Sequence, residues 1–353
     1  MSLNKQKAWK VLLVSLAAAV SFSMLSACSS KSDNAEDNSK AVATYTGGTI
    51  TEKEFALDQK IMKFLSPEQA QYLEIDAFKE SILKQEVAFE YLATKATDEA
   101  KKQAEKEADA QVASLKTGLA DTYESTLKEQ DLTEADIHTY MLRVLTVYQD
   151  MLLKVTDDQV TKEFEATKGD FTVSTLRHVL IGLTDANSKA RTNADALKLA
   201  KDVKAQLDAG ADFATIAKKY SDDTGSKDAG GEYKDKALGT YVEEFKKAAQ
   251  TLPLNTISEP VETTYGYHII EVESRTDKTF DQLTDEQKDG IKSSLASKGL
   301  ETFLEKGMDD LKVVINLPKS SAAANESGTT NTGTSEPTAA PSADAPAATE
   351  AAK

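Results

Sequence analysis

The stretch that decides the fold reads Leu176-Arg177-His178-Val179-Leu180-Ile181, in which apolar and β-branched residues surround one histidine. A second stretch of this kind follows later in the chain and reads Tyr267-His268-Ile269-Ile270-Glu271-Val272. Such stretches predict β-strands. Antiparallel pairing of the two strands would bring the imidazoles of His178 and His268 together at the centre of a sheet. A buried pair with a purely structural role explains the same pattern, so two strand histidines alone do not establish a site.

The residues between these strands predict a unit of the α+β class. Apolar residues recur there at helical spacing, glycines mark a loop, and a short apolar run marks one more strand. The predicted elements are helices over 187–209, 213–220 and 242–251, a strand over 257–261, and a loop that holds Gly225, Gly230 and Gly231.

Both flanks of this unit are dominated by helical periodicity, and the charged stretch 98–130 is expected to be a solvated helical arm. A short strand is predicted within 41–50, a helix over 280–311 and a last strand over 311–317. Because a short strand needs a partner edge, we expect the last strand to pair near 45–50.

The predicted divisions of the chain are a lipoprotein signal peptide at 1–27, a polar tether at 28–40, a helical N-terminal domain at 41–173, the α+β unit at 174–275, a C-terminal helix and strand packed on the N-terminal domain at 276–318, and a disordered Ala, Ser, Thr and Pro tail at 319–353.

The N-terminal residues have the pattern of a secretory signal. Three lysines precede an apolar run over 11–24, which is about 14 residues long and shorter than the roughly 20 that cross a hydrocarbon core. The run ends in Leu25-Ser26-Ala27-Cys28, which resembles a bacterial lipobox. This resemblance implies a diacylglycerol thioether on Cys28, and two acyl chains anchor a protein durably in a bilayer. An ordinary cleaved signal with an incidental cysteine is the alternative.

The composition excludes several classes of protein. The chain has 353 residues and a formal net charge of −16, so no nucleic acid is expected as a partner. One cysteine and three histidines are too few for a disulfide framework or a cysteine-rich zinc site. The third histidine, His138, falls on a predicted helix and is expected to be structural. We therefore expect no metal and no cofactor.

Four segments resemble the parvulin family of peptidyl-prolyl isomerases, in the same order. They read Leu176-Arg177-His178-Val179-Leu180-Ile181, Tyr220-Ser221-Asp222-Asp223, Gly230-Gly231-Glu232 and Gly266-Tyr267-His268-Ile269-Ile270. With the lipobox and the helical flanks, the whole chain resembles the PrsA foldase lipoproteins of Gram-positive bacteria. The resemblance implies an α+β fold in which a parvulin-like domain, an antiparallel sheet with surrounding helices, is inserted in a mainly helical chaperone domain built from N- and C-terminal segments.

The resemblance also implies the residues of a site, three of them catalytic and five of them substrate-binding. These are His178, Asp223 and His268, and Tyr233, Tyr241, Phe245, Thr263 and Tyr265. The chain departs from the family over 232–236, where Glu-Tyr-Lys-Asp-Lys replaces the usual Asp-Leu-Gly-Trp-Phe. This polar segment is expected to admit water at one wall of the pocket, so we expect weak isomerase activity.

The implied function is that of an extracytoplasmic foldase, anchored at the cell membrane of a Gram-positive-type bacterium, that isomerises X–Pro bonds. Its partners would be unfolded or emerging secreted polypeptides, and the lipid bilayer through acylated Cys28. One alternative is an ATP-independent holdase chaperone with a catalytically degenerate parvulin domain. Another is a solute-binding lipoprotein. The sequence does not decide between a monomer and a homodimer.

We predict that Cys28→Ala releases the protein from the membrane or mislocalises it, because the acylated thiol is its anchor. Metabolic labelling should place labelled fatty acid on the wild-type chain and none on Cys28→Ala. A wild-type chain without label would contradict the lipobox. Membrane fractionation alone does not decide, since an unprocessed precursor keeps its apolar run.

Overall fold

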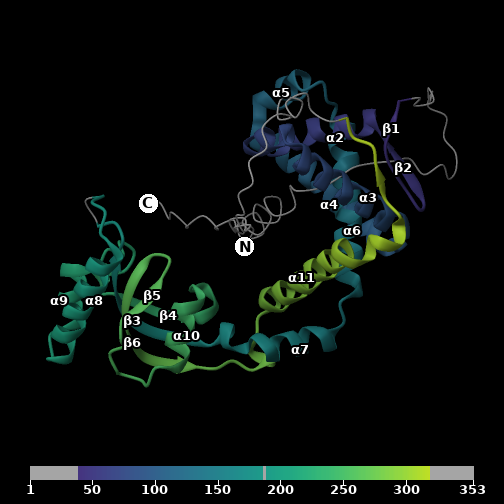
Figure 1. Cartoon of the computed structure of the whole chain (residues 1–353). Helices are drawn as coiled ribbons and strands as arrows, with labels where there is room; N and C mark the ends of the chain where they lie inside the picture. The colour runs from purple at the N-terminus through teal and green to yellow at the C-terminus, as the bar shows by residue number, and fades with distance from the viewer. Residues whose placement is uncertain (1–38, 186–187, 319–353) are drawn as a thin grey trace, which may run out of the picture.

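The computed structural model describes residues 39–185 and 188–318. The predicted signal peptide, Cys28 and the predicted tail lie outside these residues. Figure 1 shows a helical part, which contains both ends of the described chain, and a smaller part built around a sheet. The expected fold class is confirmed, because an antiparallel-sheet domain is inserted in a mainly helical domain. Within the described ranges, no helix combines the length and the apolar character that are needed to span a bilayer.

The helical part is formed by the chain before the inserted domain and by the segment that returns after it. Its elements are β1 (Ala41–Tyr45), β2 (Gly48–Thr51), α2 (Glu52–Leu65), η1 (Pro67–Glu74), α3 (Asp76–Lys95), α4 (Asp98–Leu119), η2 (Ala120–Thr122), α5 (Tyr123–Glu129), α6 (Glu134–Lys154), α7 (Asp157–Thr167), η3 (Lys168–Phe171), η6 (Phe280–Gln282), α11 (Asp285–Thr302), η7 (Phe303–Gly307), η8 (Asp309–Leu311) and β7 (Val314–Ile315). Helix α6 lies at the centre, because α2, α3, α4 and α11 all pack against it. The stretch 98–130, which was expected to be a solvated arm, therefore packs on α6, because it contains helix α4.

Threonine residues start several of the helices. Each has an extended backbone, and its side-chain oxygen accepts a hydrogen bond from an N–H of the first turn, which would otherwise lack a partner. In α2, α6, α7 and α11 the third helical residue also bonds back to the threonine N–H, which completes a capping box. The capping threonines include Thr51, Thr97, Thr133, Thr156, Thr192 and Thr284.

A three-stranded sheet joins the two ends of the described chain. Strands β1 and β2 form an antiparallel hairpin, and β7 pairs with the other edge of β1, with Ala43 opposite Ile315. The last strand thus pairs just before the expected segment 45–50. It is shorter than the predicted 311–317, because Lys312 has a left-handed backbone (φ 51°) that interrupts an extended chain.

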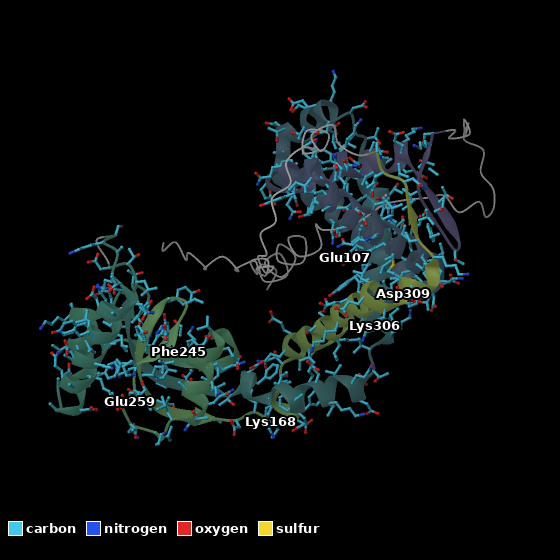
Figure 2. All side chains as sticks on the ribbon, viewed as in Figure 1. Glu107, Lys168, Phe245, Glu259, Lys306 and Asp309 are labelled. Atoms are coloured by element: carbon cyan, nitrogen blue, oxygen red, sulfur yellow. The ribbon has the colours of Figure 1, made fainter. Side chains whose placement is uncertain are left out.

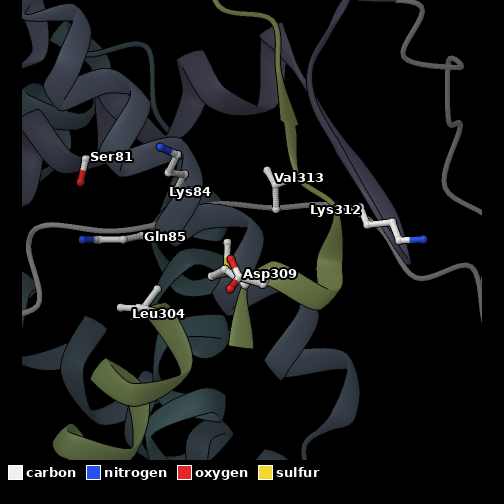
Figure 3. A pocket seen from close by; sticks show the side chains of 8 residues that line it. Ser81, Lys84, Gln85, Leu304, Asp309, Lys312 and Val313 are labelled. Atoms are coloured by element: carbon white, nitrogen blue, oxygen red, sulfur yellow. The ribbon is translucent and has the colours of Figure 1, made fainter. Parts of the chain in front are cut away.

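A cavity of about 470 Å³ lies where the returning segment meets α3 (Figure 3). The returning segment is held on α3 by Phe303, whose ring stacks on that of Tyr91 with the ring centroids 6.0 Å apart. The cavity therefore lies between α3 and the returning segment, which are far apart in the sequence. The residues that line the cavity are Ser81, Lys84, Gln85, Leu304, Met308, Asp309, Lys312 and Val313.

The inserted domain is built on a four-stranded antiparallel sheet with the strand order β4-β3-β6-β5. Its elements are β3 (Val173–Gly182), α8 (Asn193–Asp208), α9 (Phe213–Tyr220), η4 (Lys227–Ala229), β4 (Glu232–Ala237), η5 (Leu238–Thr240), α10 (Glu243–Thr251), β5 (Val261–Thr263) and β6 (Gly266–Thr276). Helices α8 and α9 cover the face that carries Val179, Ile181 and Ile269. Helix α10 places Phe245 on the opposite face. The first and last strands lie side by side at the centre, as predicted.

Several predicted boundaries were wrong. Helix α8 begins at Asn193, not at 187, because Thr192 caps it. The strand expected over 257–261 is displaced to β5, and Ile257 forms only an isolated bridge. Pro260 explains this displacement, because it has no N–H to donate to a ladder.

The helix expected over 280–311 was also too long. Helix α11 covers only its middle, and a π-helical turn, η7, follows it. The segment 232–236, expected as part of a polar loop, forms most of the edge strand β4.

A group of buried charged residues lies inside the helical part. Asp58, Glu86 and Glu90 are each at most 3% exposed. Arg143 donates a hydrogen bond to Asp58 at 2.8 Å, and the hydroxyl of Tyr45 donates one to Glu90 at 2.7 Å. Burial raises the pKa of Glu90 to about 7, and burial together with the Asp58 charge raises the pKa of Glu86 well above its usual range. Glu86 and Glu90 therefore retain protons at a higher pH than ordinary carboxyls do.

We predict that Glu90 contributes less and less to the stability of the chain as the pH rises from about 5 to about 8. Folded Glu90 keeps its proton up to about pH 7, whereas the unfolded side chain releases it near pH 4.5. The folded state therefore binds more protons over this range, and its stability falls by about 3 kcal/mol for this group.

Relative to the wild type, Glu90→Gln should therefore gain stability between pH 5 and pH 8. Glu107→Gln, which changes an exposed carboxyl of α4 (Figure 2), should keep the pH dependence of the wild type. Urea unfolding of the full chain at pH 5 and pH 8 measures both. A Glu90→Gln chain with the same pH dependence as the wild type would contradict the prediction.

Candidate active site

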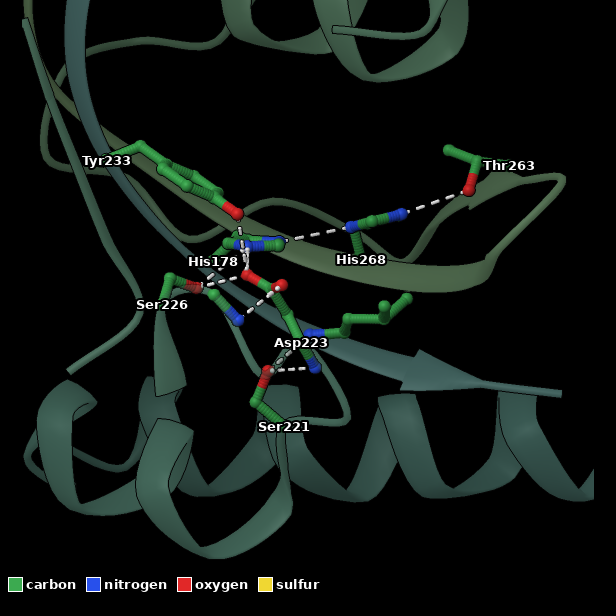
Figure 4. A network of polar contacts seen from close by, with 9 residues as sticks. His178, Ser221, Asp223, Ser226, Tyr233, Thr263 and His268 are labelled. Carbon is green, nitrogen blue, oxygen red and sulfur yellow. Dashed lines mark hydrogen bonds and ion pairs between the residues drawn. The ribbon is translucent and has the colours of Figure 1, made fainter. Parts of the chain in front are cut away.

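His178 and His268 lie on the two central strands and face the same side of the sheet. The register places Leu180 opposite His268, and residues two apart on a strand share a face, so His178 is the diagonal neighbour of His268. Their Nδ1 atoms are 3.1 Å apart, and both side chains are buried (Figure 4). The ring planes are inclined by only 17°. The predicted contact between the two imidazoles is confirmed.

The carboxylate of Asp223 joins this pair (Figure 4). Its Oδ2 lies 2.8 Å from His178 Nε2 and accepts hydrogen bonds from the hydroxyls of Tyr233, at 2.9 Å, and Ser226. Burial disfavours the charged carboxylate, but the hydrogen bonds with His178 and Ser226 outweigh it and hold the pKa of Asp223 below its usual range. Asp223 is therefore ionised at neutral pH and only accepts hydrogen bonds.

The ionised carboxylate fixes one end of the network. Because Asp223 only accepts, Nε2 of His178 carries a proton and donates it to the carboxylate. The two Nδ1 atoms form a hydrogen bond with each other, and Nε2 of His268 forms one with the hydroxyl of Thr263 at 3.0 Å. Burial and the neighbouring His178 lower the pKa of His268 to about 3, so this ring is neutral at neutral pH. The contacts thus place a proton on Nε2 of His178 and hold both rings in position.

Two glycines let the neighbouring chain approach the histidine strands. Gly231 has a left-handed backbone (φ 77°), and a Cβ there would collide with the carbonyl oxygen of His178. The carbonyl of Gly231 in turn accepts from the N–H of His178 at 2.9 Å. Gly266 (φ 128°) has no room for a Cβ beside the carbonyl of Ile181. A side chain at either position would push its segment away from β3.

Three aromatic side chains, which we call the aromatic wall, pack beside the histidine pair. The ring of Tyr233 lies 5.2 Å from that of His178, measured between centroids. Phe245 meets His178 and His268 edge-on at 5.5 Å and 5.1 Å, and Tyr241 lies 4.7 Å from Phe245. The structure therefore brings Tyr233, Tyr241 and Phe245 together, as the sequence analysis expected of substrate-binding residues.

Tyr233 fills the wall of the pocket at which the polar segment 232–236 was expected to admit water. Its strand β4 pairs with β3, with Tyr233 opposite Leu176, and only the residues at 234–236 are exposed. Polar residues suit an edge strand that faces solvent. The polar composition of 232–236 therefore reflects a strand edge, and weak activity stays a prediction.

The other site residues differ in their exposure to solvent. Thr263 is buried against His268, whereas Tyr265 is 56% exposed and contacts the site through its N–H, which donates to the Thr263 hydroxyl at 3.1 Å. Ser226, which lies 3.1 Å from His178 and donates to Asp223, was not identified from the sequence. A serine in a polar loop has no spacing or composition signal that marks it.

Comparisons with known proteins agree with this geometry. A family model described as "Rotamase: PPIC-type PPIASE domain" matches residues 178–274, which include both histidines. "Foldase protein PrsA 3" of Bacillus anthracis is 35% identical over 278 residues, which are 78% of this chain and 81% of that protein. This chain belongs to the PrsA foldase family.

Two further relatives illustrate the similarity within the PrsA family. "Foldase protein PrsA" of Geobacillus kaustophilus is 30% identical over 275 residues, which are 76% of this chain and 82% of that protein. A solved structure titled peptidylprolyl isomerase (PrsA) from Bacillus anthracis is 26% identical, covers 63% of this chain and 92% of its own, and has a TM-score of 0.41. The inserted domain is a parvulin-type peptidyl-prolyl cis/trans isomerase. The roles of single site residues stay predictions.

We predict that Asp223→Ala slows the isomerisation of a proline peptide about tenfold, a loss of about 1.4 kcal/mol of transition-state stabilisation. The substitution leaves the donors of His178, Ser226 and Tyr233 without their acceptor, so His178 is free to change tautomer. The control is Asp228→Ala, which removes an exposed carboxylate from the same loop. An Asp223→Ala chain with the wild-type rate would show that the carboxylate does not orient the pair.

Proposed function

We propose that this foldase is anchored by acylated Cys28 on the outer face of the cell membrane, where it isomerises X–Pro bonds of unfolded or emerging secreted polypeptides. One observation carries the catalytic part: the hydrogen-bonded rings of His178 and His268 are joined to Asp223 beside an aromatic wall. The lipobox pattern supports the anchor, and the helical domain supplies a second region that binds the polypeptide.

The reaction requires little chemistry from the protein. Amide resonance resists rotation by about 18 to 20 kcal/mol, and an X–Pro bond isomerises in tens of seconds or longer. This is slow enough to limit folding. A thousandfold acceleration corresponds to about 4 kcal/mol of stabilisation that the twisted amide receives and the planar amide does not. No covalent intermediate is needed.

The aromatic wall supplies part of this difference. A planar amide is dipolar, with negative charge on its oxygen, and loses much of that charge separation as it twists. Transfer from water to a site lined by Tyr233, Tyr241 and Phe245 therefore destabilises the planar form more than the twisted one. The wall acts through its environment and needs no nucleophile.

The carboxylate of Asp223 acts in the same direction. As an ion that only accepts hydrogen bonds, it cannot donate one to the amide oxygen. Its charge repels that oxygen, and the repulsion weakens as the oxygen loses charge in the twisted amide. The histidines hold the carboxylate and the floor of the site in place.

The purified full chain should accelerate the cis/trans exchange of a short X–Pro peptide above the spontaneous rate. Phe245→Leu keeps an apolar residue in the core but removes the ring that meets both histidines, so it should lower this rate. Suppression of aggregation of an unfolded client, measured in parallel, should change little. A folded wild-type chain that suppresses aggregation but leaves the peptide at its spontaneous rate would favour the holdase alternative.

A further inference from the structure

The hydroxyl of Tyr241 is buried, and the structure gives it no hydrogen-bond partner among the described residues. Buried hydroxyls are nearly always paired, because an unpaired one has lost its bonds to water without compensation. An unpaired hydroxyl in a catalytic domain therefore needs a reason. Its position in the aromatic wall suggests that the missing partner belongs to the substrate.

The neighbouring hydroxyls of the site are already engaged. Those of Ser226 and Tyr233 donate to Asp223, and that of Thr263 bonds to His268. Tyr241 stands beside Tyr233, with the two ring centroids 5.9 Å apart. Burial raises the pKa of Tyr241 above its usual range, so its hydroxyl keeps its proton and remains a donor.

We propose that the Tyr241 hydroxyl donates a hydrogen bond to the prolyl nitrogen of the X–Pro bond as this bond twists. The proposal rests on the isomerase function proposed above and assigns a group that acts in the transition state. A planar amide nitrogen shares its lone pair with the carbonyl and accepts no hydrogen bond. When the bond twists, the lone pair returns to the nitrogen, which then becomes an acceptor.

The chemistry explains why the donor has no partner in the free protein. An interaction accelerates a reaction only if it is stronger in the transition state than in the ground state. A donor that is unpaired both in the free protein and beside a planar amide meets this condition. A hydrogen bond to the carbonyl oxygen would have the opposite effect, because it favours the planar, dipolar form.

Access to the hydroxyl depends on the edge of the sheet. Because the hydroxyl is shielded from solvent, a prolyl ring reaches it only when a neighbouring side chain moves. Tyr233 is the half-buried neighbour on the edge strand β4, and its displacement requires its hydroxyl to release Asp223. Proline binding and displacement of Tyr233 are therefore linked steps.

The test is Tyr241→Phe, which keeps the ring and removes only the donor. We expect kcat for a proline peptide to fall about tenfold and KM to change less than twofold. The melting temperature should stay the same or rise, because the substitution removes an unpaired buried group. Tyr220→Phe, which removes the hydroxyl that bonds to Gln206 outside the site, should leave kcat unchanged.

Three results would overturn the proposal. An unchanged kcat would show that the hydroxyl does not act in the transition state. A raised KM with the wild-type kcat would show that it binds the planar substrate. A clear fall in the melting temperature would show a structural partner. A wild-type chain without isomerase activity is a different result, because it rejects the proposed function itself.

Discussion

The antiparallel pairing of β3 with β6 determines both the site and the way in which the two domains are joined. Their register places Leu180 opposite His268 and so makes His178 its diagonal neighbour. A shift by one residue would turn one imidazole towards α8 and α9 and leave Asp223 with a single ring or none. The same two strands carry the chain into the inserted domain and out of it. The contact between the two imidazoles therefore depends on one ladder of backbone hydrogen bonds.

The fold could be predicted where burial leaves a pattern of large apolar residues. The central strands and helix α9 are recognisable in this way, because they pack on the core through Val179, Ile181, Ile216 and their neighbours. Strand β4 could not be recognised, because an edge strand carries lysines and acids on its exposed side. The prediction that the region of helix α4 is solvated was wrong for a different reason. Its buried face consists largely of Ala100, Ala104 and Ala108, which are too small to stand out from a charged sequence.

The site residues were likewise predictable only in part. Those in short motifs could be identified from the sequence, whereas those that a bent loop brings in could not. His178, Asp223 and His268 lie in short motifs and were identified by residue type and order, and the structure joins them. The contributions of Ser226 and of the Tyr233 hydroxyl depend on how the loop between α9 and β4 bends back. That bend is made by left-handed glycines and hydrogen bonds within the loop, which no linear spacing specifies. The hydrogen-bond partners of the two imidazoles likewise follow only from the complete set of contacts.

The pairing of β1 with β7 has a consequence for the order in which the protein forms during synthesis. The inserted domain is complete once β6 has emerged, because its first and last strands are partners. The sheet of the helical part gains its third strand only when the chain has been made almost to the end of the described residues. Domains fold as units while a chain emerges, and distant contacts close late. In a newly made molecule, the isomerase domain is therefore complete before the domain that surrounds it in the sequence.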